Sequence, residues 1–204
     1  MSKLICKAVL FVIFPAAIIV GNWILSDYAS RPGEQGDGVS DLRTVSFAGG
    51  LATACDDPRQ ALFIFYHPHC PCTTATIRNL ERLAGRFAEP TQVWAIAFCP
   101  SATPESWVDS ATTKRLVANV GASLLADTDG KIAMQFGAKT SGHVMLYNAQ
   151  RQLTFSGGIT PGRGHEGDCA ASDDLLRSIH GEFDETKKWP VHGCPISREE
   201  NAQS

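Results

Sequence analysis

Two histidines and two cysteines occupy six consecutive positions, His67 to Cys72, in the stretch FYHPHCPCTT. Thiolate is the reactive form of cysteine, so a close pair of cysteines can exchange disulfides with another molecule. Imidazole nitrogen and thiolate sulfur are also ligands that Zn(II) and copper take in proteins. The stretch therefore predicts a redox pair or a metal site, and an inert structural pair is the third interpretation.

The residues on either side of this stretch predict the elements that position it. ALFIFY, residues 61–66, is a short apolar run that predicts a buried strand. Residues 73–87 place apolar side chains on one helical face and charges on the other, which predicts an amphipathic helix. The two cysteines thus lie at a junction between a strand and a helix.

Pro71 fits the first position of that helix, because its fixed φ suits a helix and its missing N–H would have no partner there. Cys70 is then the expected N-cap, and Cys72 lies in the first turn. A helix N-terminus stabilises a thiolate, so we expect Cys70 to attack and Cys72 to resolve the mixed disulfide. His67 and His69 are expected to lower the pKa of the thiol or to move protons.

The remainder of the globular region alternates strands with helices. Strand-helix-strand order implies parallel neighbours, and a hairpin near the end adds antiparallel ones. We therefore expect an α/β domain in which helices flank a mixed sheet. The further expected strands are 91–98, 123–127, 143–148 and 152–158, the expected helices are 111–120 and 169–181, and KIAMQFG is expected to form a short helical turn.

The composition agrees with a folded domain and excludes one class of partner. Hydrophobic residues make up 44% of the 204 residues and charged residues 19%, which is enough apolar material for a core. The formal net charge is −3, and the chain has no run of Lys or Arg. Binding to nucleic acid therefore has no electrostatic support.

The N-terminus predicts a membrane anchor. Residues 8–25 contain no charge and would span roughly 27 Å as a helix, about the thickness of a hydrocarbon core. Lys3 and Lys7 precede this run, which predicts a short cytoplasmic N-terminus, residues 1–7, and a body outside the cytoplasm. The alternative is a cleaved signal peptide.

Residues 26–40 are rich in Gly, Pro and acidic groups, so we expect a flexible linker between the anchor and the domain. The expected localisation is a single-pass membrane protein of the cell envelope, with the domain in the periplasm or an equivalent extracytoplasmic space. Of the seven cysteines only Cys6 lies on the cytoplasmic side of this arrangement. The others face an oxidising compartment, where disulfides are permitted.

A strand that ends in a Pro-Cys motif, opens an amphipathic helix and is followed by a C-terminal hairpin and helix resembles the thioredoxin-like superfamily over residues 41–182. The chain also resembles the membrane-anchored thioredoxin-like proteins labelled RedB. Both resemblances imply a thioredoxin-like fold and a redox-active centre at Cys70 and Cys72.

The sequence departs from this family at two places. The family uses Cys-x-x-Cys, whereas Cys70-Pro71-Cys72 is one residue shorter. A cis-proline of the family is replaced by Ser141-Gly142-His143 before the hairpin strand. The resemblance implies that Gly142 and His143 lie beside the site. The two departures put thioredoxin-like substrate docking and a thioredoxin-like redox potential in doubt.

The metal hypothesis needs ligands from outside the stretch, because four donors so close together cannot easily close one tetrahedral site. A hairpin brings His143, at the start of its first strand, toward the edge that carries the cysteines, and its return loop brings His165. Cys194 lies beyond the last helix, where it can fold back as a third thiol or ligand, or pair with Cys55 or Cys169. The metal hypothesis names six ligands: His67, His69, Cys70, Cys72, His143 and Cys194.

Three functions remain open from the sequence. The first is a membrane-tethered thiol–disulfide oxidoreductase, which needs no cofactor and acts on cysteine-containing envelope proteins or a membrane electron donor. The second is a copper or zinc binding protein of the metallochaperone type. The third is a non-catalytic thioredoxin-like docking module. For each of these functions, the pairing of Cys55, Cys99, Cys169 and Cys194 is left open. Residues 183–204, after the expected domain, are expected to form a C-terminal tail.

Overall fold

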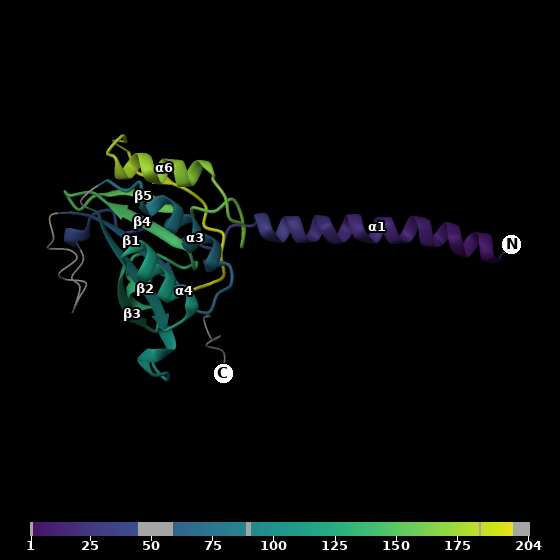
Figure 1. Ribbon diagram of the computed structural model, residues 1–204, viewed down its shortest axis with the longest axis horizontal. Coiled ribbons are helices and arrows are strands. Elements are labelled where there is room, and N and C mark those ends of the chain that lie inside the picture. Colours follow the sequence, from purple (N-terminus) through teal and green to yellow (C-terminus); the bar gives the residue numbers. More distant parts are fainter. Residues whose placement is uncertain (1, 45–58, 89–90, 184, 198–204) are drawn as a thin grey trace.

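A computed structural model describes residues 2–44, 59–88, 91–183 and 185–197, with side chains from residue 11 onward. Its domain contains one six-stranded mixed sheet with the strand order β3-β2-β1-β4-β5-β6 (Figure 1). The strands are β1 Gln60–Tyr66, β2 Thr91–Cys99, β3 Ser123–Thr128, β4 His143–Tyr147, β5 Leu153–Gly157 and β6 Lys187–Lys188. Strand β1 is central, parallel to β2 and antiparallel to β4.

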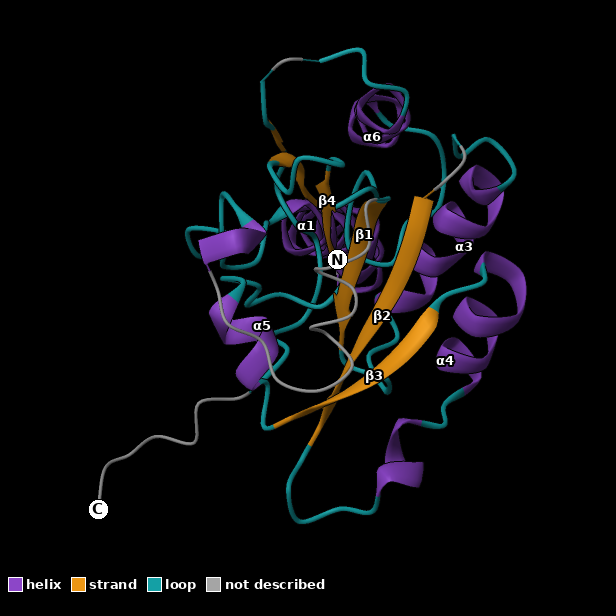
Figure 2. Cartoon of the chain, turned by 90° about the vertical axis from the view of Figure 1, so that its left-hand side faces the viewer, coloured by secondary structure: helices purple, strands orange, loops and turns teal. Residues whose placement is uncertain are grey.

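Helices cover both faces of this sheet (Figure 2). Leu62, Ile64 and Tyr66 of β1 point into a core that they share with the helices on one face, while Phe63 and Phe65 point into a second core on the other. The alternation follows from the period of two in a strand. The first face carries α3 Thr73–Ala84, α4 Ala111–Arg115 and α6 Ala170–Ile179, and the second carries α5 Lys131–Gln135.

This arrangement confirms the expected thioredoxin-like α/β fold. Each expected strand is present to within two residues at either end, and the hairpin of β4 and β5 is antiparallel. The expected helix 111–120 is divided, because α4 passes at Leu116 into a π-helical turn that ends at Gly121. Gly121 has φ +70°, a left-handed conformation that glycine adopts without strain.

The N-terminal helix α1 Ser2–Ser30 projects away from the domain (Figure 1). Within it, Phe11–Ser30 has a mean hydropathy of 1.5 and none of it is buried. A long exposed apolar helix near an N-terminus is typical of a membrane anchor or a signal sequence. The helix extends five residues beyond the expected end at residue 25.

The segment between α1 and the domain differs from the flexible linker that its composition predicts. Residues 26–30 complete α1, and the backbone of residues 33–40 is bonded to the domain. The Gly33 amide donates to Val191 O at 2.8 Å, and the Gly36 amide donates to Gly137 O at 2.9 Å. Glycine allows this close approach, since a Cβ on Gly36 would lie 3.1 Å from the backbone of Gly137.

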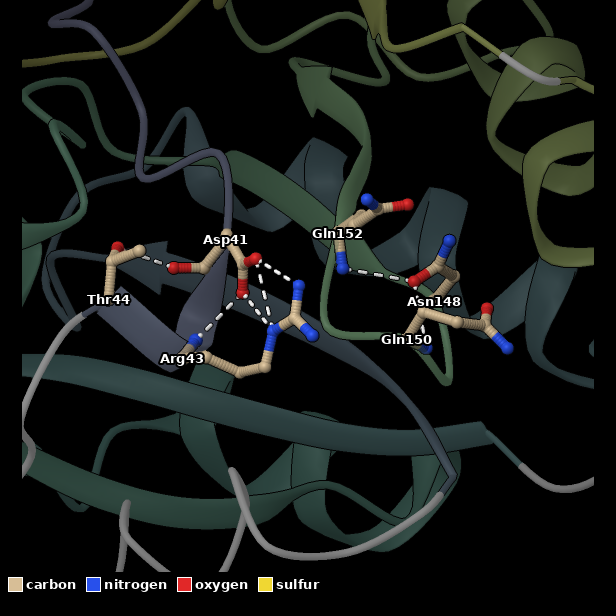
Figure 3. Close-up of polar contacts among 6 residues, drawn as sticks. All are labelled: Asp41, Arg43, Thr44, Asn148, Gln150 and Gln152. Carbon is tan, nitrogen blue, oxygen red and sulfur yellow. Dashed lines mark hydrogen bonds and ion pairs between the residues drawn. The ribbon is translucent and has the colours of Figure 1, made fainter.

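The chain enters the domain at Asp41, beside the turn between β4 and β5 (Figure 3). The Asp41 carboxylate accepts the Arg43 amide at 2.9 Å and pairs with its guanidinium, while Asn148 Oδ1 accepts the Gln152 amide at 3.0 Å. These bonds with Arg43 lower the pKa of Asp41 to about 2. The contacts of Asp41 lie next to Leu42, which enters the second core.

The C-terminal segment, expected as a tail beyond a domain that ends at residue 182, packs against that domain. Strand β6 pairs with β5, and Val191 is buried. Ile196 is 3% exposed and lies in the second core. The domain therefore continues to at least Ile196, because this segment buries the apolar side chains of Val191 and Ile196 against the rest of the domain.

Candidate thiol site

Three sulfur atoms converge at the carboxyl end of β1. The Sγ atoms of Cys70, Cys72 and Cys194 all lie within 4.8 Å of one another. Among the described residues, no other group of three or more His, Cys, Asp or Glu side chains brings its ligand atoms so close together. We call these three residues the thiol cluster.

Local backbone bonds place Cys70 at the end of the strand and Cys72 at the start of the helix. The expected helical register is wrong by two residues: α3 begins at Thr73, and its N-cap is Cys72 instead of Cys70. The Thr73 amide donates to Cys70 O at 3.2 Å, and the Thr74 amide donates to Pro71 O at 3.2 Å. These bonds span three residues, so Cys70 to Cys72 form a tighter turn of the 3₁₀ type ahead of the α-helix.

A chain of hydroxyl groups ends on the Cys70 sulfur. The His67 amide donates to Ser141 Oγ at 2.9 Å, and Ser141 Oγ lies 2.6 Å from Thr73 Oγ1. Side-chain and backbone hydrogen bonding from Thr73 lowers the pKa of Cys70. When the Thr73 hydroxyl donates to the Cys70 thiolate, the Ser141 hydroxyl is the donor in the Ser141–Thr73 pair.

The environments of the three thiols separate their pKa values. Burial raises the pKa of Cys70, but hydrogen bonds from Cys194 and Thr73 outweigh it, and the net pKa lies below the usual 9.0. Burial and the adjacent Cys70 charge raise the pKa of Cys72, which the positive charge of Arg163 partly offsets. Burial, together with the neighbouring Cys70 and Cys72, raises the pKa of Cys194 to about 12. The cluster therefore carries its first negative charge on Cys70.

The C-terminal segment holds Cys194 in place through its backbone. The Ser141 amide donates to Cys194 O at 2.8 Å, and the Ile196 amide donates to Lys139 O at 2.9 Å. Thr140 and Pro195 form an antiparallel bridge between them. Residues 194–196 therefore lie against residues 139–141 through an isolated antiparallel bridge.

The site opens into a cleft of about 840 Å³. Cys70 and Cys194 line it, together with Tyr28 at the end of α1 and Arg163 from the loop after β5. The Arg163 amide donates to Ala29 O at 2.9 Å, and its guanidinium stacks 5.1 Å from the Tyr28 ring centroid and donates to Gly193 O. Arg163 thereby joins the end of α1 to the segment that carries Cys194.

His67 and His69 lie beside the thiols and face an aromatic group. The His67 ring stacks on Phe98 with centroids 5.5 Å apart, and the His69 ring meets Trp107 edge-on at 4.5 Å. His67 Nδ1 accepts the His69 amide at 3.2 Å, and His69 Nε2 lies 3.1 Å from Trp107 O. Both rings line the cleft, yet neither belongs to the thiol cluster.

Gly142 and His143 lie next to the end of β1. The Gly142 amide donates to Phe65 O at 2.9 Å. Gly142 has φ +92°, and a Cβ there would lie 2.7 Å from Thr76 Oγ1, so only glycine fits between this loop and α3. His143 is 1% exposed, its Nε2 lies 2.9 Å from Ser156 Oγ, and burial lowers its pKa to about 4. The buried ring lies beside Ser156 of β5 and is not part of the thiol cluster.

His165 lies in a second cleft, between the end of α1 and the loop after β5. The ring is exposed, and its Nδ1 lies 2.9 Å from Arg163 O. The acidic neighbours of this loop pair with α3: Glu166 with Arg78 at 2.6 Å and Asp168 with Arg82 at 3.1 Å. The structure therefore does not bring His165 to the thiols.

The remaining cysteines lie apart from the cluster where the structure describes them. Cys99 is buried at the end of β2, with its sulfur 3.7 Å from Thr103 Oγ1. Cys169 is the N-cap of α6 and is a free thiol, as is Cys194. The structure thus does not contain the Cys169–Cys194 pair that the sequence left open. Cys55 lies outside the described residues, and so does the side chain of Cys6.

Four site residues were not singled out from the sequence, namely Thr73, Trp107, Ser141 and Arg163. Ser141 was named only as part of the loop that replaces the cis-proline. The hydroxyl of Thr73 had a sequence signal, since Thr directly follows Cys72 at the start of the helix. Trp107 and Arg163 come from loops distant in the sequence, and their roles depend on the tertiary fold.

Comparisons with known proteins support the fold. No protein-family model matches the chain, and no curated protein matches it. A hypothetical protein of Sinorhizobium meliloti 1021 is 22% identical with a TM-score of 0.57, over 82% of this chain and 96% of that one. An uncharacterized conserved protein of Geobacillus kaustophilus is 16% identical with a TM-score of 0.56, over 85% and 95%. A secreted Mycobacterium tuberculosis disulfide oxidoreductase is 18% identical with a TM-score of 0.43, over 72% and 95%.

Proposed function

We propose that the protein is a thiol–disulfide oxidoreductase whose nucleophile is Cys70. The observation that carries this proposal is the convergence of three thiols around one sulfur that its neighbours stabilise as a thiolate. A stabilised thiolate next to a second thiol is the arrangement that disulfide exchange needs, because the first attacks and the second releases the product. No cofactor is required for this chemistry.

Access and charge support the same role. Cys70 is 5% exposed but lines an open cleft, so a disulfide can reach its sulfur from one side only. Hydrogen bonds from Cys194 and Thr73 favour the thiolate form of Cys70, and Arg163 lines the same cleft. A thiolate in such surroundings is a better leaving group as well as a nucleophile, which favours exchange in both directions.

We further propose that α1 anchors the domain at the outer face of a membrane and that its partners are found there. Tyr28 at the end of α1 lines the same cleft as Cys70, so an inserted α1 would hold the thiols close to the membrane surface. Cysteine-containing envelope proteins or a membrane electron donor are the partners that fit this position. The finer resemblance, to membrane-anchored RedB-like proteins, stays a prediction.

The test is the rate of exchange between the full-length chain in detergent and oxidised glutathione. Cys70→Ser is expected to reduce the rate to that of the reaction without protein. Cys99→Ser is the matched control, since Cys99 is also 5% exposed and ends a neighbouring strand. Equal rates for the Cys70→Ser variant and the unmodified chain would contradict the proposal, and a docking module without catalysis would then be the better account.

A second function is favoured by the same three sulfurs. Thiolates select Cu(I), and three of them can supply a trigonal site or three of four positions around Zn(II). The histidines of the original hypothesis are not part of this set, because the thiol cluster contains none of them. Anaerobic titration of the reduced full-length chain with Cu(I) or Zn(II) tests it: binding of one ion that Cys70→Ser abolishes and Cys99→Ser leaves intact would support it, and absence of stoichiometric binding would exclude it.

A further inference from the structure

The third thiol, Cys194, comes from a segment that the domain holds firmly. Two buried apolar residues flank it, Val191 at 0% and Ile196 at 3% exposure. Gly193 makes the approach possible, since a Cβ there would lie 2.0 Å from Ser141 O. Backbone bonds of Cys194 and Ile196 to residues 139–141 complete the attachment. A cysteine so fixed against Cys70 is a built part of the site.

The local conformation disfavours Cys72 as the direct partner of Cys70. Bonds from the Thr73 and Thr74 amides wind residues 70–74 into a helical turn. The sulfurs of Cys70 and Cys72 lie within 4.8 Å of each other, so the restriction on Cys72 comes from the backbone of this turn and not from the distance. A disulfide needs its two sulfurs at about 2.05 Å with a dihedral near 90°, so a Cys70–Cys72 bond requires this turn to open. Cys194 approaches from another segment and is free of that restriction.

From these observations we infer that Cys194 is the resolving cysteine, and that exchange proceeds through a disulfide between Cys70 and Cys194. This inference rests on the proposed function and names a further catalytic residue for it. The Cys194 sulfur lies within 4.8 Å of the reacting Cys70 sulfur. Cys72 then remains a thiol while the cluster is oxidised.

The exchange is balanced in two steps. The Cys70 thiolate attacks a substrate disulfide R–S–S–R′, the Cys70–S–R bond forms, and R′–S⁻ leaves and takes a proton from water. The Cys194 sulfur then attacks the Cys70 sulfur, its proton passes to the departing R–S⁻, and the Cys70–Cys194 bond forms. The substrate disulfide gains two electrons and the cluster loses two, and the reverse sequence oxidises a substrate dithiol.

The test maps the disulfide that forms in the full-length chain after treatment with oxidised glutathione and alkylation. Cys70 and Cys72 lie on one tryptic peptide, residues 60–78, and Cys194 lies on another, residues 189–198. A link between these two peptides is expected in the Cys72→Ser variant, where Cys70 is the only cysteine left on the first. In Cys194→Ser, this link is lost and the Cys70–glutathione mixed disulfide accumulates.

Other outcomes separate this inference from the proposed function. A closed Cys70–Cys72 bond in the unmodified chain, with unchanged exchange by Cys194→Ser, would overturn the role of Cys194 and leave the function standing. Accumulation of glutathione on Cys70 in Cys72→Ser, with Cys194 still free, would overturn it as well. Failure of Cys70 to react in every variant would contradict both.

Discussion

The cysteines and the histidines of this protein are arranged in opposite ways. Three cysteines from two distant segments meet within 4.8 Å. The histidines disperse: His67 and His69 pack on aromatic rings, His143 is buried against Ser156, and His165 lies in another cleft. The comparison shows that a dense His/Cys stretch is not by itself a ligand set. The geometry therefore favours sulfur chemistry at this site, with His67 and His69 beside it in the cleft.

The largest expected effect is the pH dependence of stability that the buried His143 causes. Burial lowers the pKa of His143 from 6.5 to about 4 in the folded protein. Between these values the unfolded chain binds a proton that the folded protein rejects, so unfolding becomes easier as the pH falls. At 1.36 kcal/mol per pKa unit, we expect the free energy of unfolding to fall by about 3 kcal/mol between pH 7 and 4 through this residue.

Denaturant unfolding at several pH values measures this effect in the unmodified chain and in His143→Gln. The variant should lose that part of the pH dependence, whatever its stability at pH 7. His69→Gln is the control for removal of a histidine and should keep the dependence, because it retains His143. Identical pH profiles for His143→Gln and the unmodified chain would contradict a neutral, structural His143.

The second-largest effect is expected from displacing Cys194 from the thiol cluster. Gly193→Ala places a Cβ 2.0 Å from Ser141 O, which the segment cannot accommodate without moving Cys194. We expect a loss of about 1–3 kcal/mol of stability, typical of overpacking, together with faster alkylation of Cys194. Gly85→Ala is the matched control, since none of the described residues would lie within 4 Å of its Cβ. Equal alkylation rates in the two variants would show that Gly193 does not hold Cys194 at the cluster.

A smaller effect tests the hydroxyl chain that ends on Cys70. Ser141→Ala removes the donor that orients the Thr73 hydroxyl, so the pKa of Cys70 should rise, by less than about one unit because the bond is indirect. The pH dependence of Cys70 alkylation reports this shift. Ser178→Ala is the control, because Ser178 is also buried and its hydroxyl has no hydrogen-bond partner in the described part of the chain. A Cys70 pKa that falls or stays constant in Ser141→Ala would rule out this chain of donors.

The smallest effect concerns the histidines nearest the thiols. His69→Ala removes a ring that contacts Trp107 and leaves the groups that stabilise the Cys70 thiolate in place. Exchange with oxidised glutathione should therefore change by less than about tenfold, which is below the range expected for loss of a general acid or base. A loss of a hundredfold or more would make His69 a proton-transfer residue and weaken the contrast between the two residue types.

The sequence was sufficient for the fold and for the first two thiols, for local reasons. A buried strand followed by Pro-Cys and an amphipathic helix predicts a junction whose geometry depends on neighbouring residues only. The sequence predicted Cys70 as the N-cap, whereas the N-cap in the structure is Cys72. Pro71 did not distinguish the two, because a 3₁₀ turn also accepts proline.

The contribution of the C-terminal segment was not predictable in the same way. Cys194 lies 122 residues after Cys72 along the chain (194 − 72), and its position depends on Val191 and Ile196 finding places in cores built by other elements. Gly193 was the signal that a close backbone approach occurs there, but no local pattern identifies Ser141 as the partner. Similarly, the composition of residues 31–40 predicts flexibility, whereas their backbone bonds are made with distant residues.

The most direct test of the account is a redox titration of the full-length chain in glutathione buffers, with the free thiol at Cys70 measured by alkylation and mass spectrometry. The account predicts that Cys70 passes reversibly between a free thiol and a disulfide within the thiol cluster as the buffer becomes more oxidising, while Cys99 stays free. If Cys70 remains a free thiol over the whole range, as Cys99 does, the cluster is not a redox centre and the central claim is contradicted.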